Sequence, residues 1–295
     1  MSGAIAHVGP NLPQDLLRAT GRHAGPLGFD PERPTPTADR WMESKFAPWA
    51  RAILEGWAAG EYDGLAQVVF SRADDSAQRL YYYLCELQRR EAVGGPEPLI
   101  LDIAKVPRSS SEARTAYSLR QLAERLGVND SALADAIDAC NAARARPTPP
   151  PSGRHCLLAG TPPPDRRLHE AAARAGFTAS GSTLVETWTQ LGAVVDVASD
   201  DPISALARQV HADPAGPRSF AEPGAALIQA IAHSGAEAVV LWQIEEDEAQ
   251  AWHLPAQRAA LAREGLPALV MTRRDWLARD GAADEISAFL KGVGQ

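Results

Sequence analysis

The chain has 295 residues, a length that predicts two domains, each large enough to bury its own core. Apolar residues make up 45% and charged residues 22%, which excludes a disordered chain, a collagen-like repeat and a disulfide-stapled mini-domain as descriptions of the whole. The formal net charge of −8 indicates a surface that repels nucleic acid and anionic lipid. We therefore expect no nucleic-acid partner, and any anionic ligand needs a local basic patch.

The three cysteines, Cys85, Cys140 and Cys156, form no CxxC pair, and an odd number argues against a disulfide framework. The first residues, MSGAIAHVGPNLPQDLL, lack the basic and apolar regions of a signal peptide. No stretch approaches the roughly 18 apolar residues that span a bilayer. These features predict a cytoplasmic protein with no membrane partner.

Short, near-continuously apolar runs alternate with segments of helical spacing. The runs are typical of strands buried on both faces of a parallel sheet and lie at 65–70, 98–103, 155–160, 237–242 and 267–272. A Pro- and Gly-rich stretch separates a short N-terminal element from the first long helix. Helices are expected at 38–59, 75–91, 111–126, 165–175, 201–212, 249–264 and 281–292. This alternation predicts layered α/β domains with parallel sheets.

The clearest break in the chain is the sequence NAARARPTPPPSG, residues 141–153. Its prolines forbid helix and remove the backbone donors that a sheet needs. We interpret it as a linker and expect an N-terminal α/β domain with a helical extension at 1–146, the Pro-rich linker at 147–153 and a C-terminal α/β domain at 154–295.

A weak internal repeat relates the two halves. Residues 71–90 and 244–263 each follow an apolar run, open with acidic residues and share the pattern D-x-A-Q, which begins at Asp75 and at Asp247. Each copy then continues into an Arg-rich helix. The pattern indicates a duplication with one copy in each domain.

Both copies begin where a strand ends, and in open parallel sheets ligands bind outside the carboxyl ends of the strands. If the domains face each other, the two acidic motifs converge on one cleft, where we expect Asp74, Asp75 and Asp247 to be catalytic. The residues expected to bind the ligand are Ser71, Arg72, Ser76, Arg79, Thr161 and Trp252. In the simpler interpretation, Asp74 or Ser76, and Asp247, only cap their helices, each bond contributing about 1 kcal/mol.

The sequence lacks the common motifs of other catalytic and cofactor-binding sites. There is no GxGxxG, GxxxxGK[ST], GxSxG or HExxH pattern, and the seven histidines show no metal-ligand spacing. Basic residues that could meet a phosphate group near the cleft include Lys105, Arg108, Arg273 and Arg274.

Five segments, in order, resemble the 2-hydroxyacyl-CoA dehydratase and benzoyl-CoA reductase family. They are PQDLLRATGRHAGPL near the N-terminus, FAPWARAIL (46–54), DDSAQRLYYYL (74–84), AGTPPPDRRLHEAAARAG (159–176) and DEAQAWHLPAQRAALAREGLPALVMT (247–272). The resemblance covers most of the chain. It implies two flavodoxin-like parallel-sheet domains with helical N-terminal additions, and a dehydratase- or reductase-like role with an acyl-CoA ligand.

The same resemblance implies a four-iron four-sulfur cluster held by three cysteines, and this chain departs from that pattern. The matching positions are Ala47, Asp74 and Asp247, the last with a register that also admits Glu245 or Glu246. Carboxylates are hard donors, whereas iron–sulfur clusters depend on thiolates. We therefore expect no cluster and no other cofactor, and read the existing cysteines as buried structural residues.

Three hypotheses follow for function. The chain is a cluster-free subunit that binds an acyl-CoA and supports a homologous cysteine-bearing subunit or a second copy of itself. Alternatively, it is an enzyme that uses its cleft carboxylates for acid–base or divalent-metal chemistry. The third hypothesis is a binding or regulatory protein without catalytic activity.

Overall fold

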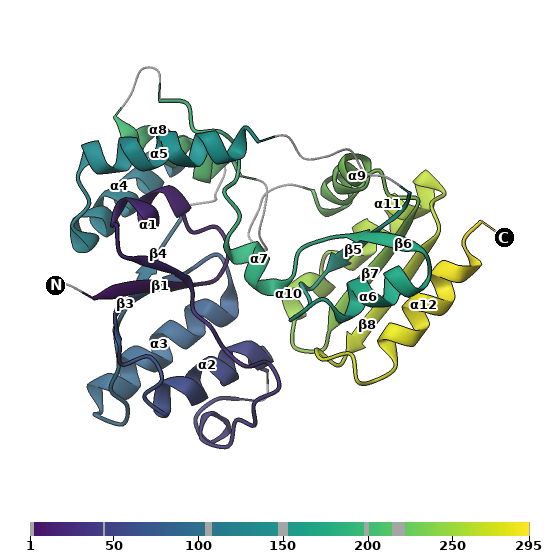
Figure 1. Ribbon diagram of the computed structural model, residues 1–295, viewed down its shortest axis with the longest axis horizontal. Helices are drawn as coiled ribbons and strands as arrows, with labels where there is room; N and C mark the ends of the chain where they lie inside the picture. Colours follow the sequence, from purple (N-terminus) through teal and green to yellow (C-terminus); the bar gives the residue numbers. More distant parts are fainter. Residues whose placement is uncertain are drawn as a thin grey trace. The chain divides into compact units, whose positions relative to one another are not determined.

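The computed structural model describes residues 3–43, 45–103, 108–146, 153–197, 201–213 and 222–294. It shows an α/β protein with two four-stranded, all-parallel sheets flanked by helices, as predicted, consistent with two flavodoxin-like domains (Figure 1). The linker predicted at 147–153 lies, apart from Gly153, outside the described residues. None of the described helices is long and apolar enough to cross a bilayer.

The contacts divide the chain into two units. Unit 1 contains residues 1–147 and 188–220, and unit 2 contains residues 148–187 and 221–295. The sequence analysis assigned residues 188–220 to the C-terminal domain, whereas here they are grouped with the N-terminal part of the chain. The chain therefore passes between the units three times.

The sheet of unit 1 has the strand order β2-β1-β3-β4, with parallel pairing throughout. The predicted strands at 65–70 and 98–103 are β3 (Leu65–Ser71) and β4 (Glu97–Leu101). The two other strands were not predicted: β1 (Ala4–Val8) is short and carries a histidine, and β2 (His23–Pro26) contains Gly and Pro. The N-terminal residues thus supply part of the sheet as well as the helix α1 (Gln14–Ala19).

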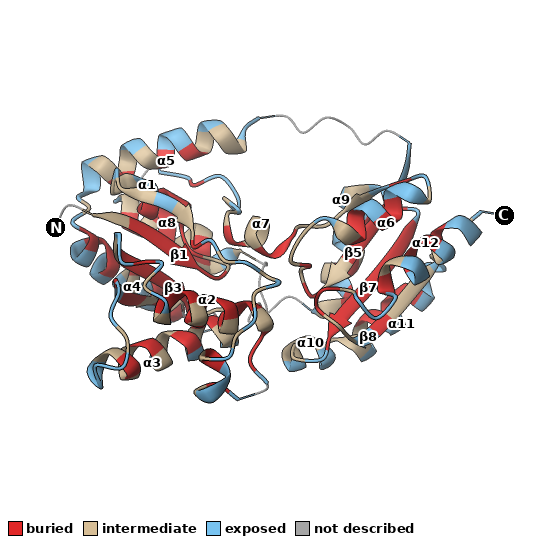
Figure 2. Cartoon of the chain, turned by 60° about the horizontal axis from the view of Figure 1, so that its bottom comes forward, coloured by how far each residue is buried: buried red, intermediate tan, exposed pale blue. Residues whose placement is uncertain are grey.

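Helices cover both faces of this sheet. One face packs against α1, α4 (Ser111–Leu126), α5 (Asp130–Arg144) and α8 (Pro202–Ala212), in a core that includes Ile5 and Val69. The other face packs against α2 (Pro48–Ala58) and α3 (Asp75–Arg89), where Trp57 contacts Phe70. Figure 2 shows the buried residues on the strands and on the inner sides of these helices.

Two predictions for unit 1 were wrong in their extent. A continuous helix was expected at 38–59, but only a 3-10 turn, η1 (Ala38–Arg40), and α2 form, because Pro48 suits the first turn of a helix and not its interior. Residues 141–144 were expected in the linker but belong to α5, which was not predicted. The side chain of Asn129 starts α5 by accepting a bond from Ala132 N at 2.9 Å.

The sheet of unit 2 has the order β6-β5-β7-β8. The predicted strands at 155–160, 237–242 and 267–272 are β5 (Arg154–Gly160), β7 (Ala238–Ile244) and β8 (Ala268–Arg274), while β6 (Phe177–Ser180) was not predicted. Both sheets therefore place their first strand between the second and the third. The two halves of the weak repeat follow β3 and β7, which occupy the same place in the two sheets.

The helices of unit 2 also cover two faces. A core with Leu157 and Val239 packs against α9 (Pro223–Ser234) and α11 (Leu254–Glu264), and α6 (Arg167–Arg174) packs against α12 (Ala282–Gly292). The helix predicted at 249–264 is interrupted, forming a short α10 (Glu248–Ala251) before α11, which begins with a proline in its first turn. One further helix, α7 (Leu184–Trp188), ends at Trp188, which is the first residue of the segment 188–220 that is grouped with unit 1.

Candidate functional site

Each sheet has one point where consecutive connections leave toward opposite faces. In unit 1 this switch point lies between β1 and β3, and in unit 2 it lies between β5 and β7. The carboxyl ends of these strand pairs are the preferred ligand position in open α/β sheets. The candidate site residues predicted from the sequence lie around these two points.

A glycine with positive φ ends the central strand at both switch points. Gly9 follows β1 with a φ of 97°, and Gly160 ends β5 with a φ of 98°. A Cβ on Gly9 would lie 2.8 Å from the Cβ of Ser71, and one on Gly160 would lie 2.2 Å from the Trp242 carbonyl oxygen. Glycine is therefore required at both places by conformation and by space. The sequence analysis did not single out either residue.

Asp74 caps a helix at the edge of unit 1. It is the N-cap of α3, and its carboxylate accepts a bond from Ala77 N at 2.8 Å. Asp75 follows in the first turn and is exposed, whereas Ser76 is half-buried. The capping hypothesis is thus confirmed for Asp74, a role that a negative charge at a helix N-terminus favours.

Three other candidates of unit 1 also have structural contacts. Ser71 is buried, and its hydroxyl accepts a bond from Ala73 N at 3.1 Å. Arg72 forms an ion pair with Asp102, the residue that follows β4, and its backbone N–H donates to the Leu101 carbonyl at 3.1 Å. This pair links the ends of β3 and β4. Sequence reasoning missed Asp102, although an acidic residue directly after an apolar run is the available signal.

Arg79 lies further along α3 and is exposed. Its guanidinium carbon lies 5.7 Å from the centre of the Phe46 ring, a cation–π distance. Phe46 immediately precedes Ala47, which is buried and serves as the N-cap residue of α2 without a side-chain bond. The arginine thus contacts the segment that precedes α2.

At the edge of unit 2, the structure brings two predicted residues together. The hydroxyl of Thr161 donates to the Asp247 carboxylate at 2.8 Å, and Thr161 N donates to the Trp242 carbonyl at 2.8 Å. Asp247 also caps α10, accepting from Gln250 N at the longer distance of 3.4 Å. Thr161 is buried and Asp247 is half-buried, so one carboxylate is oriented by a hydroxyl at the switch point itself.

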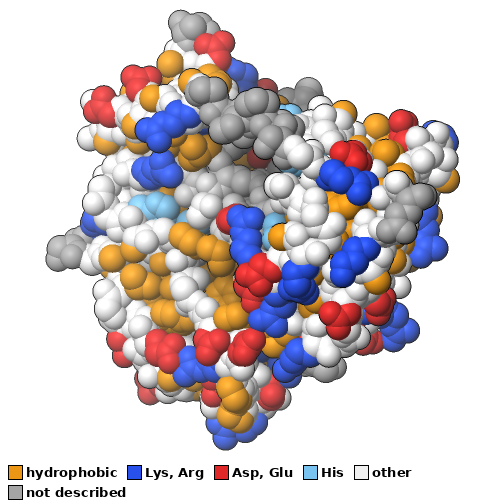
Figure 3. Space-filling view, turned by 45° about the vertical axis from the view of Figure 1, so that its right-hand side comes forward, with side chains coloured by type: hydrophobic (Ala, Val, Ile, Leu, Met, Phe, Trp, Pro, Cys, Tyr) orange, Lys and Arg blue, Asp and Glu red, His pale blue; other side chains and the backbone are white. Residues whose placement is uncertain are grey.

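The neighbouring charges of this edge are paired. Glu245 accepts a bond from Arg273 at 2.8 Å, and this ion pair raises the pKa of the arginine. Arg274 pairs with Asp280 at 2.8 Å and with Glu285 at 2.6 Å. Figure 3 shows the same intermixing on one face of the molecule, where Lys and Arg side chains lie beside Asp and Glu. Of the predicted basic residues, Arg273 and Arg274 therefore already have carboxylate partners, and Lys105 lies outside the described residues.

Trp252 is the most exposed large apolar side chain among the described residues, at 84%. It lies between α10 and α11, five residues after Asp247. The capped acidic turn, the Thr161 hydroxyl and this indole together form the unit 2 edge. Whether Asp74 and Asp75 share a cleft with Asp247 stays a prediction.

The residues at the family's cluster positions do not fit a cluster. Ala47 has no side-chain atom that could bind a metal, the Asp74 carboxylate caps α3, and the Asp247 carboxylate accepts a hydrogen bond from Thr161. Among the described residues no group of three or more His, Cys, Asp or Glu side chains could hold a metal ion. The donor set at these positions consists of a methyl group and two carboxylates, which are poor ligands for iron–sulfur clusters.

The cysteines occupy other places. Cys85 lies on α3 and Cys140 on α5, on opposite faces of the unit 1 sheet, while Cys156 lies in β5 of unit 2. Burial raises the pKa of all three thiols, that of Cys156 to about 11. Such thiols are poorly ionised near neutral pH and suit packing better than coordination. Since the sheet separates Cys85 from Cys140, the three cysteines cannot share one pocket.

Comparison with protein-family models and with curated proteins finds no match to this chain.

Proposed function

We propose that this chain is a subunit of a 2-hydroxyacyl-CoA dehydratase-like or benzoyl-CoA reductase-like complex in the cytoplasm. In this role it binds an acyl-CoA-type ligand and holds no iron–sulfur cluster of its own. Its partner is a homologous subunit that keeps the cysteines, or a second copy of the chain where no such subunit exists. The observation that carries the proposal is the pair of parallel sheets of identical strand order, with carboxylates at the ends of their third strands.

The chemistry of the side chains supports a role without redox turnover in this chain. The cluster of the family needs three thiolates, and the residues at the matching positions are Ala47, Asp74 and Asp247. Asp74 already accepts a bond from a backbone N–H, and Asp247 accepts one from a hydroxyl group. Electron transfer to a substrate in such a complex would then depend on the partner subunit. This chain would contribute binding and orientation.

Arginines at the carboxyl edges support an anionic ligand. Arg72 and Arg273 are ion-paired with Asp102 and Glu245, and the side chain of Arg273 is 78% exposed. An exposed ion pair is weak, so a phosphate group can replace the carboxylate at little cost. The exposed Trp252 offers an apolar ring on the same edge.

The test of the proposal is anaerobic purification of the chain with its native partners, followed by iron and sulfide analysis of the separated subunits. The expected result is a colourless chain that co-purifies with a cysteine-bearing, iron-containing subunit. A brown chain that carries iron and sulfide in cubane proportion after anaerobic reconstitution would refute the cluster-free role.

Ligand binding is tested separately by titrating the complex with CoA thioesters. The variant Arg273→Gln should bind at least about 5-fold more weakly, because a charge-assisted bond to phosphate contributes about 1 kcal/mol or more. The matched control is Arg174→Gln, another exposed arginine of unit 2, at the end of α6. Equal binding by both variants would remove Arg273 from the ligand site, and saturable binding without turnover in any complex would favour a regulatory role.

A second candidate function rests on the contact between Thr161 and Asp247. A half-buried carboxylate held by a hydroxyl at a switch point is suited to accept or donate a proton, or to bind a hard divalent cation. In this case Asp247→Asn would abolish a metal- or pH-dependent reaction of CoA thioesters without unfolding the chain. An unchanged rate in this variant would discard the hypothesis.

A further inference from the structure

The two described sheets have four edge strands, and three of these have features that prevent an edge from pairing with another chain. The strands β2 and β6 are only four residues long, and β2 ends with Pro26. The third, β4, contains Pro98. Short edge strands and prolines are common means of blocking edge-to-edge pairing. The fourth edge strand is β8.

Pro98 lies where it blocks the free edge of β4. Arg72 N donates to the Leu101 carbonyl at 3.1 Å, so the odd-numbered residues of β4 bond to β3. The backbone groups of Pro98 and Ile100 therefore face away from the sheet. Because proline has no backbone N–H, the outer edge of β4 lacks one of its donors.

The edge strand β8 has no such protection. It is seven residues long, and its first five residues, ALVMT, contain no proline, glycine or charge. Ala268, Leu269 and Val270 are only half-buried, whereas the neighbouring β7 is buried throughout. A long edge of apolar, uncharged residues is the kind with which another strand pairs.

The backbone groups on the outer side of β8 are available for such pairing. Val239 N of β7 donates to the Pro267 carbonyl at 2.9 Å, so the odd-numbered residues of β8 bond to β7. The N–H and C=O groups of the even-numbered residues point away from the sheet; these are Ala268, Val270 and Thr272. Among the described strands β8 pairs with β7 alone (Figure 1), so these groups have no strand partner.

The outward groups match a second copy of the same strand. In an antiparallel pair, two facing residues exchange both backbone bonds when the groups of both point toward the other strand. A two-fold axis at Val270 makes Val270 face its own counterpart and Ala268 face Thr272 of the other copy. All outward groups of Ala268, Val270 and Thr272 in both strands are then used, in a self-complementary interface.

The charges next to β8 also favour this antiparallel arrangement. Arg273 follows the uncharged residues, and its side chain is 78% exposed. Antiparallel pairing about Val270 keeps the two Arg273 residues about 20 Å apart, well beyond the screening length of about 8 Å, whereas parallel pairing would bring them together. Each Arg273 lies at the end of the ladder where the other copy enters from α11, which ends with the exposed Glu264.

We propose that β8 is a dimerisation edge, at which two copies of this chain pair antiparallel about a two-fold axis at Val270. The pairing joins the two unit 2 sheets, of four strands each, into one continuous sheet. It requires neither the ligand nor a cysteine-bearing subunit. A complex with such a subunit would therefore contain this chain in two copies.

The first test is sedimentation equilibrium of the purified full chain, without ligand or partner. A monomer–dimer equilibrium with a dissociation constant of about 100 μM or tighter is expected. A chain that stays monomeric throughout this range would overturn the proposal. If the chain is monomeric alone and binds a homologous subunit through β8, the occupant of the edge is that subunit and not a second copy.

Charge substitution at the axis tests the register. Val270→Lys and Val270→Glu each place like charges opposite each other, so each variant alone should dimerise at least about 10-fold more weakly. An equimolar mixture of the two variants should restore dimerisation as a one-to-one heterodimer, which also shows that both variants fold. Failure of the mixture to dimerise more tightly than either variant would overturn the pairing about Val270.

A proline substitution tests the backbone bonds. Val270→Pro removes one outward N–H from each copy and no bond to β7, so the dimer loses two bonds and its dissociation constant should rise about 30-fold. The matched control is Ile100→Pro, the same change at an outward position of β4, which should leave the dissociation constant unchanged. An unchanged dimer in Val270→Pro, or equal weakening by both variants, would show that β8 is not the interface.

Discussion

The two carboxyl edges carry an aspartate at the same topological position, and the two aspartates have different roles. Asp74 caps the fifteen-residue α3 with a bond of 2.8 Å. Asp247 caps the four-residue α10 with a longer bond of 3.4 Å and takes its stronger bond, of 2.8 Å, from the Thr161 hydroxyl. Both copies of the weak repeat thus have an aspartate after the strand. In unit 1 this aspartate stabilises the start of a helix, whereas in unit 2 it mainly binds a hydroxyl group of a neighbouring loop.

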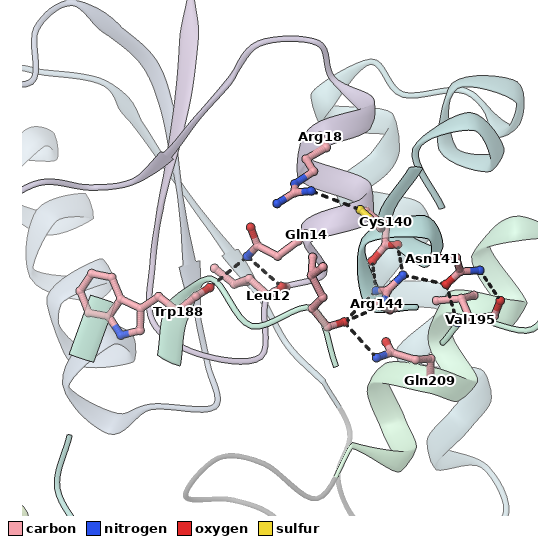
Figure 4. A network of polar contacts seen from close by, with 11 residues as sticks. Leu12, Gln14, Arg18, Cys140, Asn141, Arg144, Trp188, Val195 and Gln209 are labelled. Atoms are coloured by element: carbon pink, nitrogen blue, oxygen red, sulfur yellow. Dashed lines mark hydrogen bonds and ion pairs between the residues drawn. The ribbon is translucent and has the colours of Figure 1, made fainter. Parts of the chain in front are cut away.

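The two units also differ in how deeply an ion pair is buried. Unit 1 contains the buried pair of Asp15 and Arg144 (Figure 4), whose side chains are 1% and 3% exposed, whereas the pair of Asp165 and Arg167 in unit 2 is 38% and 27% exposed. Loss of an ion-pair partner should therefore lower the free energy of unfolding more at the pair in unit 1 than at the pair in unit 2.

The largest effect is expected from the buried pair. Asp15→Asn leaves the Arg144 guanidinium buried without its counter-charge, which should lower the free energy of unfolding by about 3–5 kcal/mol. The exposed counterpart, Asp165→Asn, should cost less than about 1 kcal/mol. Denaturant titration of both variants measures the difference, and similar losses would show that the two units are not distinguished by burial of charge.

The next effect concerns the glycines at the switch points. Gly160→Ala places a Cβ 2.2 Å from a backbone carbonyl oxygen, whereas Gly9→Ala meets side-chain atoms at 2.8 Å and 3.2 Å. Both variants are strained by positive φ, at about 1–3 kcal/mol, and Gly160→Ala should cost more because backbone cannot move aside. Thermal unfolding of the two variants gives the order, and a milder Gly160→Ala would contradict the close approach of β5 and β7.

The smallest effect separates the two aspartates. Asp74→Ala should lower the free energy of unfolding by about 1 kcal/mol through loss of the cap, and Asp247→Ala by less, because its cap bond is long and its helix short. Thr161→Val should reproduce the local effect of Asp247→Ala in unit 2. Equal and large losses in all three variants would assign Asp247 the same structural role as Asp74.

The sequence predicted most of the strands, but not which sheet each helix covers. Apolar runs such as 65–70 and 237–242 revealed the buried strands because parallel strands are covered on both faces. The strands β1 and β6 escaped because His7 and the polar residues of FTAS interrupt the apolar pattern. The helical spacing of 201–212 correctly predicted α8, but an amphipathic pattern carries no information on which sheet the helix covers.

The candidate residues could be chosen from the sequence, but the contacts that they make could not. Thr161 and Asp247 were both candidates, yet their hydrogen bond depends on the register of β5 and β7, which no local pattern encodes. Asp74 could be recognised as a possible cap from its place before a helix. The pairing of Arg72 with Asp102, and of His7 with His23, brings together residues of neighbouring strands and required the fold.

The return of residues 188–213 to unit 1 has a consequence for biosynthesis. The α8 helix packs on α4 and α5, so during translation these helices lack their cover until β5, β6 and α7 have also been made. The apolar faces of α4 and α5 are therefore open on the ribosome for at least the time needed to add some seventy further residues, at about 5–20 residues per second. The two halves of this protein cannot mature one after the other, and a nascent chain released before α8 emerges would be a substrate for chaperones.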